Sequence, residues 1–177
     1  AQLGQPMPSD AQAAAVAAAA MLSRWLHLAP SLVAAATGDD RHIWRQVAQA
    51  SRWACESYVW AAQPQKSIAA ALLGMELARS LDDRELQSYF WVLFGYLAGL
   101  VPLRSVSRSF LARSSRLISE LASPRAELDF HRIASARHMN AADWTLGEAQ
   151  MEALIALARQ LGDENALIFG LSARSIV

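Results

Sequence analysis

The sequence contains one cysteine, eight glycines and six prolines, and its formal net charge is zero. Cys55 alone cannot form an intrachain disulfide, and a structural zinc site needs four ligands. Few glycines and prolines argue against a turn-rich all-β fold. The equal numbers of basic and acidic residues give no long-range attraction to nucleic acid or to an anionic membrane. We therefore expect a protein of the reducing cytoplasm, with neither nucleic acid nor membrane as its partner.

Two apolar runs look superficially like membrane segments. Residues 11–22 lack a preceding basic stretch, and Ser9-x-x-Gln12 forms a capping box, so they favour a helix over a signal peptide. Residues 86–103 are uncharged but contain Gln87 and Pro102. The apolar side chains of this segment would lie on every side of a helix. That pattern is typical of a buried central helix rather than a membrane span.

The most informative pattern is a repeat. Segments 77–83 (LARSLDD), 117–123 (LISELAS) and 157–163 (LARQLGD) align at a spacing of 40 residues. A helical unit of this length is typical of hairpin arrays, in which each unit buries its apolar face by stacking on its neighbours. Alanine and leucine, which favour helix, dominate the composition. The sequence therefore predicts an all-α, right-handed α-solenoid of antiparallel helix hairpins with about eight helices.

Capping residues and prolines set the expected boundaries. The cap signals are Asp82-x-x-Glu85, Ser123-Pro124, Thr145-x-x-Glu148, and Asp163 or Asn165. The expected helices are 9–28, 40–62, 65–81, 84–100, 103–121, 125–141, 146–161 and 164–176. We divide the chain into an Ala-rich helical segment, 1–38, and a repeat region, 39–177, whose last hairpin is incomplete.

Residues 138–144 (HMNAADW), Glu148-Ala149 and residues 153–163 (ALIALARQLGD) resemble the G-D-W-x-x-A and L-x-x-A-L-x-L-A-x-x-L-G-D runs of tetratricopeptide-like repeats. Residues 96–103 (YLAGLVPL), followed by an Arg-rich helix, resemble the C-terminal solenoid of bacterial class III adenylate or guanylate cyclase–AAA ATPase signalling proteins. Similar solenoids occur in maltose-regulator-type activators. The resemblance covers residues 65–177 and implies a fragment of a larger signalling protein.

The chain departs from that family at Asn140, where glycine is common in the hairpin turn. It also lacks cyclase metal carboxylates and a G-x-x-x-x-G-K-[ST] phosphate loop. We therefore expect no enzyme activity and no cofactor in this chain. If the parent is an enzyme, its chemistry lies outside this piece.

Several side chains have a functional reading and a structural one. Asp39-Asp40 and Asp82-Asp83 suggest Mg²⁺ ligands, but both stand where a helix needs a cap. His131 and His138 share a face at about 10 Å of rise, too far apart to bind one metal ion directly. We read Cys55 as a small buried hydrophobe. Arginines 104, 108, 113 and 116 do not form one stripe, and the tryptophans at 53, 60 and 91 favour core packing over a groove.

The leading hypothesis is a protein–protein interaction or regulatory scaffold module. Its groove, built from the first helix of each hairpin, would bind a peptide, a neighbouring domain or a second copy. The expected groove residues are Arg84, Gln87, Ser88, Trp91, Asp129, Arg132, Ser135 and His138. Ile168, Phe169 and Leu171 lack an evident cover and predict a homodimer, a truncated last hairpin, or both. The alternatives are a small-molecule sensor with an apolar pocket between helices and a small helical enzyme using His131 and His138.

Overall fold

The computed structural model describes residues 41–100 and 103–175. In these ranges the chain forms seven α-helices and no β-strand, which confirms the expected all-α fold. The predicted helix 9–28 and the segment 1–38 lie outside the described residues. The helices are α2 (Arg41–Trp60), α3 (Pro64–Ser80), α4 (Arg84–Gly99), α5 (Arg104–Leu121), α6 (Pro124–Asn140), α7 (Trp144–Leu161) and α8 (Glu164–Arg174).

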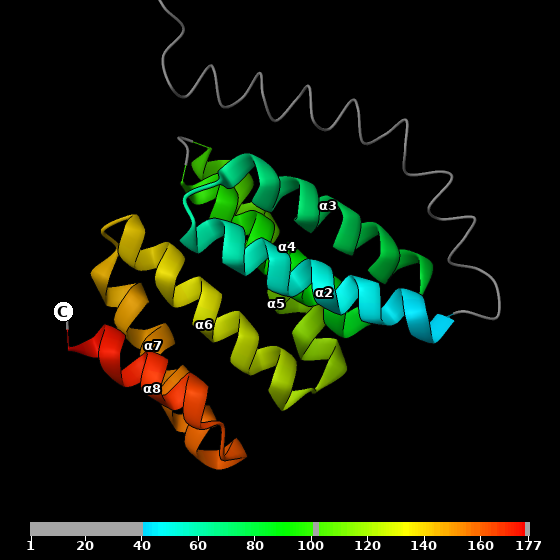
Figure 1. The fold of residues 1–177 in the computed structure, drawn as a ribbon. Helices are drawn as coiled ribbons and strands as arrows, with labels where there is room; N and C mark the ends of the chain where they lie inside the picture. The colour runs from blue at the N-terminus through cyan, green and yellow to red at the C-terminus, as the bar shows by residue number, and fades with distance from the viewer. Residues whose placement is uncertain (1–40, 101–102, 176–177) are drawn as a thin grey trace, which may run out of the picture.

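The helices pack as successive hairpins. The first helices α2, α4 and α6 each pair with the second helix that follows them, α3, α5 or α7, and α8 packs on α7 (Figure 1). Helix α4 contacts α3, α5 and α6, so it occupies the centre of the stack. Phe90 and Val92 of α4 are fully buried, as expected for a helix that is apolar on every side.

The connections between hairpins repeat every 40 residues. Asp82, Ala122 and Gly162 all adopt the left-handed conformation, with φ of 53°, 48° and 67°. The next residue in each case, Asp83, Ser123 or Asp163, is the N-cap of the following helix. Its side chain accepts a hydrogen bond from the backbone N–H three residues later, at 3.1, 3.3 and 2.9 Å. Repeated capping chemistry therefore generates the repeated turn.

Two of the expected caps are wrong by one or two residues. Helix α4 is capped by Asp83 rather than Asp82, because Asp82 takes the left-handed conformation that ends the turn. Helix α7 begins at Trp144, with Asp143 as its N-cap, rather than at Thr145. The side chain of Asp143 makes no capping hydrogen bond there. The capping-box patterns locate these helix starts to within two residues.

Small residues recur at matching positions of the two helices of each hairpin, and hydrogen bonds join the first two of the three pairs. The pairs are twelve residues apart in sequence, recur every 40 residues and are buried. The hydroxyl of Ser67 donates to the carbonyl oxygen of Cys55 at 3.1 Å, and that of Ser107 donates to the carbonyl of Gly95 at 2.7 Å. The pairs are Cys55–Ser67, Gly95–Ser107 and Ser135–Gly147. Because the first pair joins α2 to α3, this hairpin follows the same register as the later ones.

Polar contacts link the start of each first helix to the cap of the next. The three contacts each span 38 residues and recur at intervals of 40. They join Arg45 to Asp83, Glu85 to Ser123, and Arg125 to Asp163. Arg45 and Asp83 are 2.9 Å apart, and the Ser123 hydroxyl lies 2.6 Å from the Glu85 carboxylate. The residues that cap the first helices thus also hold successive hairpins together along this edge of the stack.

Candidate functional site

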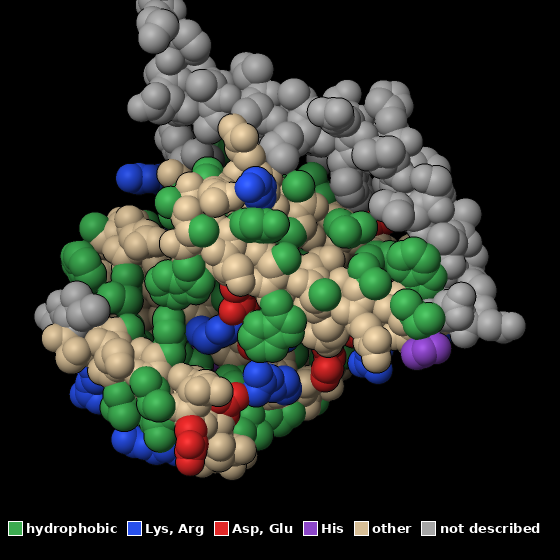
Figure 2. All heavy atoms as spheres, in the orientation of Figure 1, with side chains coloured by type: hydrophobic (Ala, Val, Ile, Leu, Met, Phe, Trp, Pro, Cys, Tyr) green, Lys and Arg blue, Asp and Glu red, His purple; other side chains and the backbone are tan. Residues whose placement is uncertain are grey.

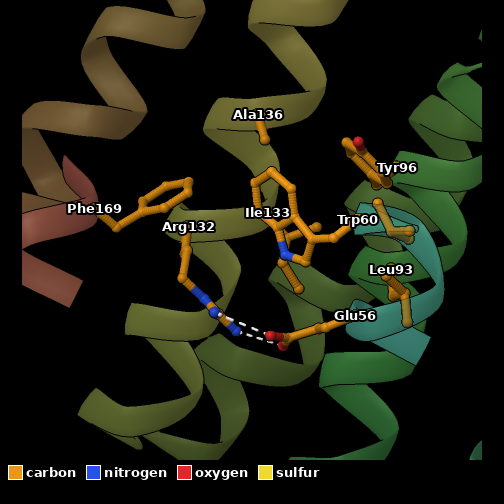
Figure 3. Close-up of a pocket in the computed structure, with 9 residues that line it drawn as sticks. Glu56, Trp60, Leu93, Tyr96, Arg132, Ile133, Ala136 and Phe169 are labelled. Carbon is orange, nitrogen blue, oxygen red and sulfur yellow. Dashed lines mark hydrogen bonds and ion pairs between the residues drawn. The ribbon is translucent and has the colours of Figure 1, made fainter. Parts of the chain in front are cut away.

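A pocket of about 90 Å³ lies on the face where the four first helices meet. Figure 3 shows its lining side chains directed toward one another from α2, α4, α6 and α8. The walls are largely apolar, and one charged pair closes one end. On the face drawn in Figure 2, hydrophobic side chains gather around a hollow between α2 and α8. The lining residues are Glu56, Val59, Trp60, Leu93, Tyr96, Arg132, Ile133, Ala136 and Phe169.

Glu56 of α2 and Arg132 of α6 form the charged end of the pocket (Figure 3). The Arg132 guanidinium donates two hydrogen bonds to the Glu56 carboxylate, at 2.6 and 3.2 Å. The Tyr89 hydroxyl donates a third, at 2.5 Å. Burial alone would raise the pKa of Glu56, but the hydrogen bonds and positive charge of Arg132 outweigh it and lower the pKa. Glu56 is therefore held as a carboxylate.

A second ion pair lies beside the first. The Arg52 guanidinium donates to Asp129 at 2.7 Å, and both side chains are buried. The same guanidinium lies 4.2 Å from the centre of the Tyr89 ring, in cation–π geometry. Burial, followed by the negative charge of Glu56, raises the pKa of Tyr89 well above its ordinary value. Tyr89 thus stays a neutral hydrogen-bond donor.

We call these five side chains the inner ion cluster: Arg52, Glu56, Tyr89, Asp129 and Arg132. Its charges are two positive and two negative, so the cluster is neutral as a whole. Both ion pairs join α2 to α6, which belong to the first and third hairpins and do not pack backbone to backbone. The long side chains therefore bridge the inner face across α4. Both bridges are hydrogen-bonded, which offsets part of the cost of burying their charges.

The tryptophans of α2 are exposed. Trp60, at the rim of the pocket, is 78% exposed, and Trp53 is 61% exposed. Core packing of these two side chains is therefore the wrong prediction. Trp91 of α4 does pack inside the hairpin, where its ring stacks on Phe110 at 5.5 Å. The periodicity shows which residues share a helix face, and only the packing shows which face is covered.

The expected groove residues lie in different surroundings. Arg132 lines the pocket and Asp129 lies beside it in the inner ion cluster. Ser88 and Ser135 are both 1% exposed, and each hydroxyl donates to a carbonyl of its own helix. Gln87 donates to the carbonyl of Ala78 on α3 at 3.3 Å.

The other three expected groove residues also lie outside the pocket. Arg84 pairs with Glu120 at the end of α5, and Trp91 faces α5. His138 lies near Asp143 at the turn between α6 and α7. The structure thus brings two of the eight residues, Asp129 and Arg132, together on the inner face. The other side chains there are mostly apolar, so the polar faces of the first helices did not indicate them.

The two histidines of the enzyme alternative have separate partners. His131 Nδ1 lies 2.7 Å from Gln150 on α7, whereas His138 Nδ1 lies 3.4 Å from Asp143. Burial, followed by the positive charge of Arg137, lowers the pKa of His138. Among residues 41–100 and 103–175, no three His, Cys, Asp or Glu side chains lie close enough to hold a metal ion. The described helices also include none long and apolar enough to cross a membrane.

The expected self-association residues lie on two faces of α8. Ile168 and Leu171 are 62% and 44% exposed. Phe169 is half-buried and directed into the pocket (Figure 3). Helix α8 therefore contributes to the pocket with one face and presents an apolar surface with another.

The chain was compared with family models, curated proteins and solved structures. It matches none of them. The geometry of this chain is therefore the guide to its function. The 40-residue register offers a sequence signal for several pocket residues that sequence reasoning missed, because each first helix contributes the same positions. Glu56, Tyr96 and Ala136 are one such set, and Leu93 and Ile133 are another.

Proposed function

We propose that this chain is a protein–protein interaction module that binds a peptide segment by accepting one apolar side chain in the pocket. The observation that carries the proposal is the convergence of all four first helices on a single, mostly apolar cavity. The exposed Trp60 at its rim is the residue type that most often anchors protein interfaces. The neutral inner ion cluster leaves no net charge to select an ionic anchor.

The size of the pocket favours a peptide over a small-molecule ligand. Its volume is about 90 Å³, whereas small-molecule sites usually enclose roughly 300–1,000 Å³. One side chain fits a cavity of this size, with the rest of the peptide lying across Trp60 and Phe169. At this pocket, the alternative of a small-molecule sensor is therefore the weaker one.

The separate surroundings of His131 and His138 likewise favour binding over catalysis. We extend the proposal to a regulatory scaffold role in a larger cytoplasmic signalling protein. That extension is supported by the resemblance of residues 65–177 to the solenoids of cyclase–ATPase proteins.

Selection from a displayed library of random peptides tests the proposal. We expect the enriched peptides to share one apolar residue, and we would measure their affinity by fluorescence polarisation. Ala136→Phe fills the pocket and should weaken binding at least about tenfold, and Trp60→Ala should weaken it by a similar factor. Trp144→Ala is the matched control, because Trp144 is 52% exposed on α7 and does not line the pocket.

Circular dichroism and thermal unfolding of each variant establish that the fold is retained. Peptides without a shared apolar residue, or equal binding to the wild type and Ala136→Phe, would contradict the proposal. An equal loss on Trp144→Ala would place the binding surface elsewhere. A library that yields no binder counts against a peptide-binding role.

A further inference from the structure

The outer face of α8 carries exposed apolar side chains that no other described helix covers. Ile168 and Leu171 are 62% and 44% exposed. The equivalent residues of α6, 40 positions earlier, are Leu128 and His131. Leu128 is 1% exposed, and the side chain of His131 is 16% exposed and contacts Gln150 of α7. The face that the second helix covers in the third hairpin is therefore bare on α8.

The second hairpin shows the same coverage. In α4 the equivalent residues are Ser88 and Trp91, which pack against α5. The Ser114 hydroxyl of α5 donates to the carbonyl of Ser88 at 2.8 Å, and Phe110 of α5 stacks on Trp91. At two equivalent positions, then, this face receives a helix. By this equivalence, the bare face of α8 is the one on which a helix would pack.

We propose that a second copy of this chain supplies that helix, through antiparallel, two-fold packing of α8 against the partner's α8. Glu164, Ile168, Leu171 and Ser175 are spaced by four, three and four residues, so they share one face of the helix. Arg174 lies at the edge of that face. The face therefore carries an acid at its start, two aliphatic residues in the middle and a base at its end.

This order is self-complementary when the helix is reversed. With the two-fold axis between residues 169 and 170, Ile168 lies opposite the partner's Leu171. Glu164 then lies beside the partner's Arg174, and the same two contacts recur on the other side of the axis. Each copy thus offers the surface that the other needs, as a two-fold interface requires. The dimer surface does not include the pocket, so the dimer can be tested independently of peptide binding.

The contact is small. Helix α8 has 11 residues, which corresponds to a length of roughly 16 Å. A single helix pair of this length buries less than the ~1,200 Å² of a standard interface. The dimer is therefore reversible, and its population rises with protein concentration.

Sedimentation velocity and light scattering of the full chain, from about 10 µM to about 500 µM, test the dimer. We expect the mass to rise from one copy towards two over this range. Ile168→Glu should leave the chain monomeric, because it places two carboxylates at the centre of the apolar contact. Leu146→Glu is the matched control, since Leu146 is a 48% exposed leucine at the start of α7 and does not belong to the α8 face.

Charge reversal tests the antiparallel geometry. Glu164→Lys and Arg174→Glu should each weaken the dimer several-fold, and the two together should restore it, because opposite charges again face each other across the axis. Arg174 also pairs with Glu152 of the same chain at 3.0 Å, so unfolding curves of each variant control for local stability.

A wild-type chain that stays monomeric throughout would overturn the proposal and leave α8 to a helix of another source. A dimer that survives Ile168→Glu would overturn it by placing the contact elsewhere. Failure of the double reversal to restore the dimer would overturn the antiparallel arrangement.

Discussion

At the scale of single residues, the turns between hairpins place one residue in the left-handed backbone conformation, which is strained for any residue with a Cβ atom. Ala122 adopts φ of 48°, a left-handed conformation that costs an L-residue roughly 1–2 kcal/mol. Its counterpart 40 residues later is Gly162, with φ of 67°, for which this conformation carries no side-chain penalty. The same turn is therefore built with a favourable residue at Gly162 and with a strained one at Ala122.

We expect Ala122→Gly to raise the free energy of unfolding by about 0.5–1 kcal/mol, because relief of the strain exceeds the added entropy of the unfolded chain. Urea denaturation measures the change. Ala156→Gly is the matched control: Ala156 is an exposed residue inside α7, so the same substitution there should lower stability by about 1 kcal/mol. Loss of stability in both variants would show that Ala122 is not strained.

Local chemistry also explains which residues the sequence predicts well. Cys55 is fully buried and burial raises the pKa of its thiol to about 11, so the interpretation as a small buried hydrophobe is confirmed. The exposure of Trp53 and Trp60 was not predictable in this way. A tryptophan on a helix stripe is compatible with a core and with a groove, and the position of the neighbouring helices decides between them.

At the scale of helices, the close approach of α3 to α4 depends on a glycine. Gly74 of α3 faces Phe90 of α4, and a Cβ added there would lie 2.0 Å from the Cζ atom of the Phe90 ring. Because Phe90 is fully buried, its ring has little room to move. The packing of the first hairpin on the second therefore depends on this glycine.

We expect Gly74→Ala to lower stability by about 1–3 kcal/mol through overpacking. Phe90→Leu in the same chain should remove much of that penalty, so a double-mutant cycle measured by urea denaturation should give a coupling of at least about 1 kcal/mol. Gly147→Ala is the control, because its added Cβ would meet the flexible Met139 side chain at 3.1 Å. Additive effects of Gly74→Ala and Phe90→Leu would contradict the contact.

Helix boundaries were predictable because the signals that set them are local. Ser123 and Asp163 cap the helices that their sequence patterns indicate. The 40-residue period was predictable for the same reason. The approach of α2 to α6 was not, because it depends on small rotations between successive hairpins that no short pattern records. The handedness of the stack stays a prediction.

At the scale of the whole molecule, the inner ion cluster links stability to pH. The pKa of Glu56 is lowered in the folded chain, so the carboxylate binds protons less readily there than in the unfolded chain. Its contribution to stability is complete above the ordinary glutamate pKa of about 4.3 and is lost as pH falls through the lower folded-state value.

We expect Glu56→Gln to lower the free energy of unfolding by about 1–3 kcal/mol at neutral pH, because Arg132 loses its charged partner. The difference between wild type and variant should shrink as pH falls below about 4.3. Urea denaturation at several pH values measures it. Glu152→Gln is the control, since Glu152 pairs with Arg174 at an exposed site. A difference that is constant with pH would contradict the role of Glu56.

The bridge between the first and third hairpins also bears on how the chain unfolds. In an ordinary solenoid each repeat contacts only its neighbours, so an end repeat can fray while the rest stays folded. Here the departure of α2 would remove the hydrogen bonds that Arg132 and Asp129 make to Glu56 and Arg52, two hairpins away, and leave only longer ion pairs within α6, such as Arg132–Asp129 at 3.7 Å. Fraying from that end is therefore penalised at a distance, and residues 41–140 should open and close as one cooperative unit rather than one hairpin at a time.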